Sequence, residues 1–109
     1  MVTFKYNNEE YALGFNRKTA EAAQSSGLNI NELTEKPLIQ IPLLVYWAFK
    51  MNHPQIKKSK TDEIYEKIGN KTGLLNALVE NYVKTYQTLL EDREDSGEDD
   101  ENFIKWSDE

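Results

Sequence analysis

Apolar and polar residues alternate near the N-terminus of the chain. Two β-prone runs, Val2–Tyr6 and residues 11–15, flank the polar residues 7–10, and a large apolar side chain stands at every second position of each run. A period of two is typical of a strand with one buried face. The pattern therefore predicts an antiparallel hairpin whose buried face carries Phe4, Tyr6, Tyr11, Leu13 and Phe15.

After residue 16 the apolar residues no longer alternate, and the pattern of Arg17–Ser25 predicts a short helix. The Asn16 side chain can accept a hydrogen bond from an amide of the first turn, and Gly27 suits the left-handed position that follows a last turn. Residues 29–36 are mostly polar and predict a turn or an irregular loop.

The most apolar stretch, residues 43–49, predicts a second helix that is hydrophobic on nearly every side. Pro37 and Pro42 bracket its beginning, where a proline in the first turn is tolerated, and Pro54 stops it after Asn52 and His53. Such a helix is either central to the core or shared with a partner. We expect His53, the only histidine, to cap the negative end of this helix as a cation.

Two more helices follow. Residues 59–62 open the third, which presents Ile64, Tyr65 and Ile68 on one face and ends at Gly69. The fourth, predicted over residues 74–94, has the clearest helical period in the chain. Its apolar stripe consists of Leu74, Leu75, Leu78, Val79, Tyr82, Val83, Tyr86, Leu89 and Leu90. The predicted fold class is mostly α (α+β): an N-terminal β-hairpin followed by about four helices, the last one long.

Charge divides the chain into a body and a tail. The net charge of −6 splits into +2 for residues 1–90, with 11 Lys/Arg and 9 Asp/Glu, and −8 for residues 91–109, with 2 Lys/Arg and 10 Asp/Glu. Residues 95–102 are mostly acidic and cannot form a core. We expect a helical domain with its hairpin over residues 1–94, and an acidic, flexible tail with an apolar end over residues 95–109.

Residue types that carry chemistry are scarce. The chain has no cysteine, one histidine and no glycine spacing of the kind that cradles a phosphate. The acidic stretch that begins at Asp92 fails as a calcium loop, because position twelve requires a bidentate Glu and is Phe103. We therefore expect no enzyme, no catalytic residue, no cofactor and no metal.

Two classes of partner also fit poorly. Lys57, Lys58 and Lys60 form the only basic cluster, without interleaved aromatic residues, and the acidic tail repels phosphate backbones. No stretch is long and apolar enough to span a membrane, and the N-terminus lacks the pattern of a signal peptide. We expect a soluble, cytoplasmic protein that binds neither nucleic acid nor membrane.

Apolar surface is the remaining feature. The second and fourth helices offer more hydrophobic faces than a hairpin and one Ala-rich helix can cover, which predicts association with another chain or with a second copy. The alternative is that these two helices simply pack on each other. The candidate partner-binding residues are Leu44, Trp47, Met51, Leu78, Tyr82, Tyr86, Leu89, Phe103, Ile104 and Trp106.

The apolar end of the tail allows two interpretations. Burying Phe103, Ile104 and Trp106 would gain roughly 5–8 kcal/mol. Ordering the last few residues would cost about 6–9 kcal/mol, so docking on the body would be easily reversed. The segment is therefore either a switch that occupies an apolar groove, for example as a strand beside Val2–Tyr6, or a frayed terminus.

Several features, taken in order, resemble a known family. They are the hairpin runs Phe4-Lys5-Tyr6-Asn7-Asn8 and Tyr11-Ala12-Leu13-Gly14-Phe15-Asn16-Arg17, the helix over residues 20–27, the apolar helix from Pro42-Leu43-Leu44 to Trp47-Ala48-Phe49-Lys50 followed by His53, and the long helix from Leu74-Leu75-Asn76-Ala77-Leu78 to Tyr82 with an acidic tail and a final Phe103-Ile104-Lys105-Trp106. Over nearly the whole chain this order resembles the small tail assembly chaperones of long-tailed bacteriophages and prophages of Gram-positive bacteria.

The resemblance implies a function. Such chaperones bind and solubilise the tape-measure protein, a very long helix-rich chain, in the bacterial host cytoplasm before the tail tube polymerises. Many of these families also make a longer product by ribosomal frameshifting. The expected partners are phage tail proteins, above all the tape-measure protein, with a homo-oligomer as a further option. Two alternatives stay open: a virion structural protein of the head–tail connector kind, and an acidic regulatory or inhibitor protein.

Overall fold

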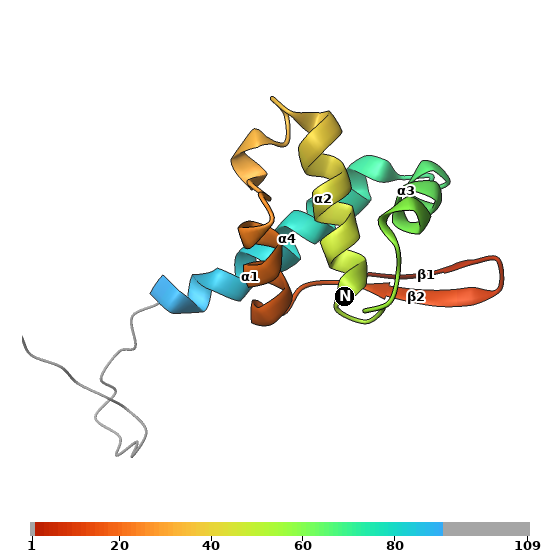
Figure 1. Cartoon of the computed structure of the whole chain (residues 1–109), viewed down its shortest axis with the longest axis horizontal. Coiled ribbons are helices and arrows are strands. Elements are labelled where there is room, and N and C mark those ends of the chain that lie inside the picture. The colour runs from red at the N-terminus through yellow and green to blue at the C-terminus, as the bar shows by residue number, and fades with distance from the viewer. Residues whose placement is uncertain (1, 91–109) are drawn as a thin grey trace, which may run out of the picture.

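A computed structural model of the chain describes residues 2–90. In this part, an N-terminal antiparallel hairpin is followed by four helices and one short 3₁₀ turn, which confirms the predicted fold class (Figure 1). The elements are β1 (Val2–Tyr6), β2 (Glu9–Leu13), α1 (Arg17–Ser25), η1 (Ile30–Glu32), α2 (Pro37–Lys50), α3 (Lys58–Glu66) and α4 (Lys71–Leu90).

The hairpin turns over two residues, whereas the sequence pattern predicted a turn of four. Asn7 and Asn8 have φ values of 50° and 68°, the left-handed conformation that a two-residue type I′ turn requires and that Asn tolerates. Residues 9 and 10 therefore belong to β2, and Tyr6 pairs with Glu9. The predicted buried face is confirmed for Tyr11 and Leu13, which lie in the core, whereas Phe4 and Tyr6 are partly buried. Phe15 also lies in the core, but it follows the end of β2 and does not belong to the hairpin.

The outer edge of β2 is hydrogen-bonded to the end of α2. The Ala12 amide donates to His53 Nε2 at 3.1 Å, and Asn52 Nδ2 donates to the Ala12 carbonyl at 3.1 Å. The Gly14 amide donates to the carbonyl of Ala48, also at 3.1 Å. A two-stranded sheet is marginal by itself, and these bonds give β2 a second neighbour in place of a third strand.

The prediction of a cationic His53 cap is wrong in its chemistry. An imidazole nitrogen that accepts a hydrogen bond carries no proton, so His53 works as a neutral acceptor for the β2 backbone. Its own amide still closes the last turn of α2 by donating to the carbonyl of Phe49 at 2.9 Å.

The first helix has the predicted bounds and both predicted end signals. The Asn16 side chain accepts from the Thr19 amide, and the Thr19 hydroxyl accepts from the Asn16 amide, which together form a capping box. At the other end, Gly27 has a φ of 112°. The amides of Gly27 and Leu28 donate to the carbonyls of Gln24 and Ala23, which is the Schellman pattern.

The second helix begins earlier than residues 43–49 suggested. It starts at Pro37 and contains Pro42. The missing Pro42 amide removes the hydrogen bond that the carbonyl of Leu38 would accept four residues earlier. Leu38 lies in the first turn of α2 and is 92% exposed, so water can solvate its carbonyl group.

The third and fourth helices also differ from expectation at their ends. Helix α3 begins at Lys58 and stops at Glu66, before Gly69. Helix α4 begins at Lys71 because Asn70 caps it: the Asn70 side chain accepts from the Gly73 amide at 3.0 Å. The expected last turn of this helix, residues 91–94, and the predicted tail, residues 95–109, lie outside the described residues.

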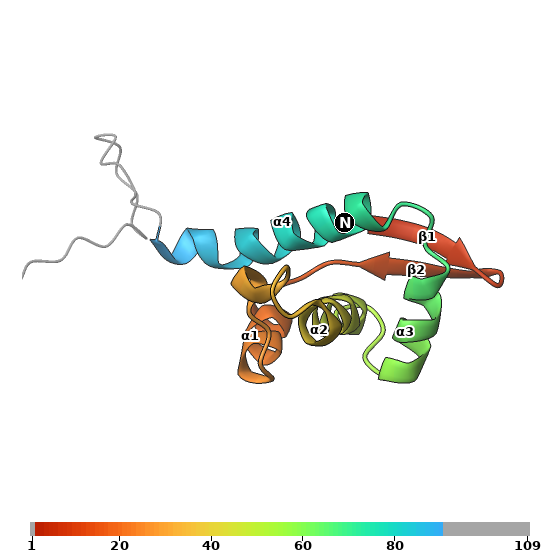
Figure 2. The same cartoon turned by 90° about the horizontal axis from the view of Figure 1, so that it is seen from above.

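The described elements form two layers (Figure 2). Helices α1, α2 and α3 lie side by side in one layer, and α4 and the hairpin lie nearly end to end in the other. Helix α2 contacts α1, α3, α4, β2 and η1. The core between the layers consists of Tyr11, Leu13, Phe15, Ala20, Ala23, Leu28, Leu44, Val45, Ala48, Phe49, Ile64, Leu74, Leu78 and Tyr82.

The two ends of the α4 stripe should differ sharply in their contribution to stability. Leu78 is fully buried, whereas Leu89 is 63% exposed. Leu78→Ala should lower the free energy of unfolding by about 2–5 kcal/mol, because it leaves a cavity in the core. Leu89→Ala should lower it by no more than about 0.5 kcal/mol. Urea unfolding of the two variants measures both values, and equal losses would contradict this assignment of core and surface.

Candidate functional site

The structure divides the candidate partner-binding residues into two groups. Leu44, Leu78 and Tyr82 are buried in the core, and Trp47 and Met51 are partly buried. Tyr86 and Leu89 are exposed by 38% and 63%. The remaining three candidates, Phe103, Ile104 and Trp106, lie outside the described residues.

Helices α2 and α4 do pack on each other, and Leu78 and Tyr82 of α4 are buried in the common core, but the apolar stripe of α4 is exposed at Leu89. The last turns of α4 project past α1, and α2 does not lie beneath them (Figures 1 and 2). The end of the apolar stripe therefore has no helix of the described body to cover it.

These last turns form one side of a hollow of about 630 Å³, which we call the α1–α4 groove. The opposite side comes from the end of α1 and from η1. A smaller hollow of about 230 Å³ adjoins it and shares the side chains of Gln24, Tyr82, Tyr86 and Leu89. The α1–α4 groove is lined by Gln24, Leu28, Asn29, Ile30, Asn31, Tyr82, Tyr86, Leu89 and Leu90.

The groove lining is uncharged and more apolar than polar, and the adjoining smaller hollow adds Arg17 and Glu21. Leucine, isoleucine and tyrosine side chains supply most of the lining, and three side-chain amides supply its polar part. Tyr82 is held by edge-to-face contacts with Phe15 and Tyr86, at ring centroid distances of 5.3 and 5.8 Å. Burial raises the pKa of the Tyr82 phenol, with Tyr86 adding to the effect, so the ring stays neutral. Such a surface suits the apolar face of a peptide segment.

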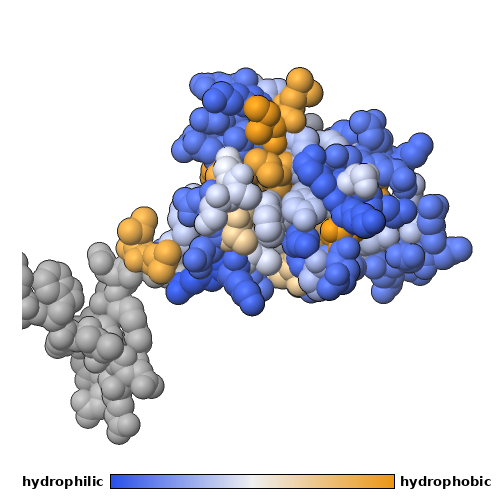
Figure 3. Space-filling model, viewed as in Figure 1, coloured by the Kyte–Doolittle hydropathy of each residue, from blue (hydrophilic) through white to orange (hydrophobic). Residues whose placement is uncertain are grey.

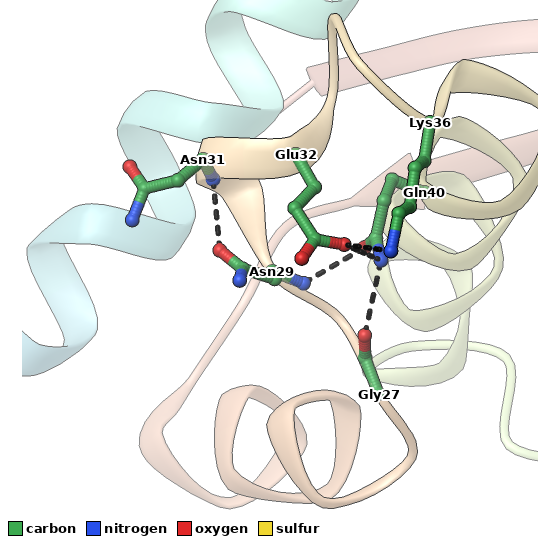
Figure 4. A network of polar contacts seen from close by, with 6 residues as sticks. All are labelled: Gly27, Asn29, Asn31, Glu32, Lys36 and Gln40. Carbon is green, nitrogen blue, oxygen red and sulfur yellow. Dashed lines mark hydrogen bonds and ion pairs between the residues drawn. The ribbon is translucent and has the colours of Figure 1, made fainter.

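A buried amide fixes the wall of this groove (Figure 4). Gln40 on α2 is 3% exposed. Its Oε1 accepts from the Asn29 amide at 2.8 Å, and its Nε2 donates to the Gly27 carbonyl at 3.2 Å and to Glu32 at 3.4 Å. Gln40 thus joins the end of α1 and η1 to the central helix, and the groove depends on its position.

Sequence reasoning missed the wall residues Leu28 and Ile30. A signal for Leu28 was present, since the residue after a Schellman glycine commonly makes an apolar contact with its helix. Leu28 is 4% exposed and packs in the core next to Ala23 and Gln24 of that helix end. The short η1, which carries Ile30, has no comparable signal within a polar loop.

A second apolar patch lies at the beginning of α2. Leu38 and Ile39 are 92% and 60% exposed. Leu38 lines a hollow of about 390 Å³ together with Tyr65, Asp62 and Glu66 of α3. Figure 3 shows this patch over the first turns of α2, well separated from the apolar patch at the end of α4.

The polar clusters of the described body have structural roles. The Tyr6 hydroxyl donates to Glu63 at 3.0 Å, and Lys60 pairs with the same carboxylate at 3.3 Å. These contacts hold the pKa of Glu63 below its usual range, so this carboxylate stays ionised and ties the hairpin to α3. Lys58 pairs with Asp62, which leaves two of the three lysines of the basic cluster in ion pairs.

Residues 2–90 contain neither a candidate metal cluster nor a candidate membrane-spanning helix. In this part of the chain, no three His, Cys, Asp or Glu side chains are grouped so that they could hold a metal ion. No helix there combines the length and the apolar character needed to cross a bilayer.

Comparison with known families gives one match, to a domain of unknown function (DUF5055), over residues 1–108. The chain belongs to the DUF5055 family. Searches among curated proteins and among solved structures find no match. The DUF5055 match includes both the described body and the acidic tail, so Phe103, Ile104 and Trp106 lie within the region that the family shares.

The Gln40 network predicts a measurable effect on the groove wall. Gln40→Met keeps the approximate volume of the side chain but leaves the Asn29 amide and the Gly27 carbonyl without their partner. We expect a loss of about 1–3 kcal/mol in the free energy of unfolding, the usual cost of a buried polar group left unsatisfied. The exposed Gln55→Met is the matched control and should change it by less than about 0.5 kcal/mol. Equal values in urea unfolding would show that the wall does not depend on Gln40.

Proposed function

We propose that this protein is a phage tail assembly chaperone that binds apolar helical segments of the tape-measure protein. The observation that carries the proposal is the uncovered end of the α4 stripe above the α1–α4 groove. Tyr86, Leu89 and Leu90 are exposed by 38%, 63% and 83% in the described structure. Contiguous apolar surface of this kind is typical of a protein–protein contact site.

The groove suits an amphipathic helix as its ligand. Such a helix presents apolar side chains at positions i, i+3, i+4 and i+7, and these insert into an apolar cleft between two elements. The lining has no charged side chain, so it accepts the apolar stripe of many different helices. A chaperone for a long, repetitive client needs this tolerance more than it needs strict sequence recognition.

The expected affinity also suits a chaperone. The groove is small, and burying Leu89 and Leu90 contributes roughly 1.5–3 kcal/mol for each side chain. One copy therefore binds weakly, and many copies along one client cover it while each remains easy to release. The net charge of −8 on residues 91–109 makes neighbouring copies repel each other, which keeps a loaded client in solution.

We do not assign an enzymatic role to the protein. The single histidine holds the β2 backbone, and the Glu63 carboxylate is engaged by Tyr6 and Lys60. An acidic inhibitor that imitates nucleic acid would need its negative charge on an ordered face. Residues 2–90 instead carry 11 Lys/Arg and 9 Asp/Glu.

The second apolar patch supports one alternative function, a ring-forming subunit of the virion. Ring subunits use two different surfaces, one on each side of the contact. The Leu38–Ile39 patch and the end of α4 are separate surfaces that could meet in this way.

Co-expression with the tape-measure protein of the same phage or prophage tests the proposal. The unaltered chain should keep this client in the soluble fraction and co-elute with it in gel filtration. Leu89→Asp should weaken the complex roughly 10-fold to 100-fold, which corresponds to the loss of one buried leucine. Leu38→Asp is the matched control, because it changes a leucine on the other patch that is also largely exposed, and it should bind like the unaltered chain.

Two results would count against the chaperone. A client that stays insoluble beside the unaltered chain would refute tape-measure binding. A client that is held equally well by Leu89→Asp would remove the groove from its binding. Stable oligomers without a client, dissolved by Leu38→Asp, would favour the ring subunit.

A further inference from the structure

The α1–α4 groove ends at the point where the chain leaves the described body. Leu90 is the last residue of α4, and it lines the groove together with Leu89. Residues 91–109 continue from this edge. Any apolar group in these nineteen residues therefore starts next to an uncovered apolar surface of the same molecule.

Such a group is present at a suitable distance along the chain. Phe103, Ile104 and Trp106 follow twelve mostly acidic or polar residues, 91–102. A flexible segment of that length has a root-mean-square span of about 17–21 Å and a maximum of about 40 Å. The groove adjoins the start of this segment, so the three side chains can reach any of its lining residues.

We propose that residues 103–106 of the same chain occupy the α1–α4 groove when no client is bound. Phe103, Ile104 and Trp106 then cover Tyr86, Leu89 and Leu90, and the acidic residues 91–102 form the loop that connects them to α4. The tail is thus an internal competitor for the groove, and a client helix must displace it.

Charge and connectivity favour this occupant over a second copy of the protein. Two copies that joined through this edge would bring together two tails of charge −8 each, which repel one another. Within one chain, the tail approaches a body of charge +2 instead. Its short connection also gives an effective concentration in the millimolar range, so weak contacts are sufficient.

The DUF5055 match agrees with a role for the tail inside the domain. The family region extends through residue 108 and so includes the apolar group. A segment that only increased solubility would not require two aromatic side chains and an isoleucine. The competition with a client rests on the proposed function, whereas the docking of the tail does not.

Tryptophan fluorescence tests the docking directly in the full-length chain. Trp47→Phe leaves Trp106 as the only tryptophan. If the tail docks, the emission of Trp106 is blue-shifted relative to a free tryptophan amide, and its acrylamide quenching constant is several-fold lower. Leu89→Asp in this background should return both values to those of the free amide, whereas the matched control Leu38→Asp should leave them unchanged.

Three results would overturn the proposal. The first is a Trp106 signal that already equals that of the free amide in the Trp47→Phe chain. The second is a protected signal that Leu89→Asp does not change, which would place the tail elsewhere. The third is protection that disappears on dilution, which would assign the docked tail to a second copy.

A second measurement avoids the substitution of Trp47, whose Nε1 donates to Ser26 at 2.9 Å. The unaltered chain labelled with 5-fluorotryptophan gives two fluorine resonances, and Trp106→Phe identifies the one from the tail. That resonance should move to the free-amide position in Leu89→Asp and should not move in Leu38→Asp. No client is present in either experiment, so failure here leaves tape-measure binding untouched, and failure of tape-measure binding leaves the docking untouched.

Discussion

Helix α2 buries one side completely and much of the remainder in part, and the other described elements are held together by their contacts with it. Leu44, Val45, Ala48 and Phe49 of α2 are at most 1% exposed, and the helix achieves this only by contacting α1, α3, α4, β2 and η1. Side-chain hydrogen bonds near both ends of α2 also attach neighbouring elements to it. His53 and Asn52 hold the edge of β2 just beyond its last turn, and Gln40 holds the η1 loop near its first. None of the attached elements is large enough to be stable alone.

The uncovered groove follows from the way α2 crosses α4. Helix α2 is seen nearly end-on in the view in which α4 runs across the picture (Figure 2). Helix α4 has 20 residues and carries its apolar stripe to the last turn, whereas α2 has 14 and crosses only its first half. The remaining turns of α4 lie beside α1, where Tyr82 is buried against Phe15 whereas Leu89 and Leu90 are exposed. The same stripe is therefore core at Leu78 and surface at Leu89. We propose that the client covers this surface and that residues 103–106 cover it when no client is bound.

The sequence was sufficient for the elements whose signals are local. The period of two gave the hairpin, Asn16 and Gly27 gave both ends of α1, and the stripe of α4 was unmistakable. The predicted ends of the helices were less accurate. The sequence pattern predicted Pro42 at the beginning of α2, but this residue is inside the helix, because the hydrogen bond that it cannot make belongs to the exposed first turn. The division of the α4 stripe into core and surface could not be predicted, since it depends on where α2 crosses α4 in space. The role of His53 was missed for the same reason, because its partner, the Ala12 amide, is 41 residues away in the sequence.

Hydrogen exchange tests the central claim most directly when Phe103, Ile104 and Trp106 are replaced by Ser, so that the tail does not compete for the groove, and when it is measured with and without a saturating amphipathic helix of the tape-measure protein. The claim is that the α1–α4 groove is the surface that receives the client. It predicts slower exchange on binding for amides in residues 24–31 and 82–90, and unchanged exchange in residues 37–45, which include the other apolar patch. Protection confined to residues 37–45, or no protection in either region while the client is bound, would contradict it.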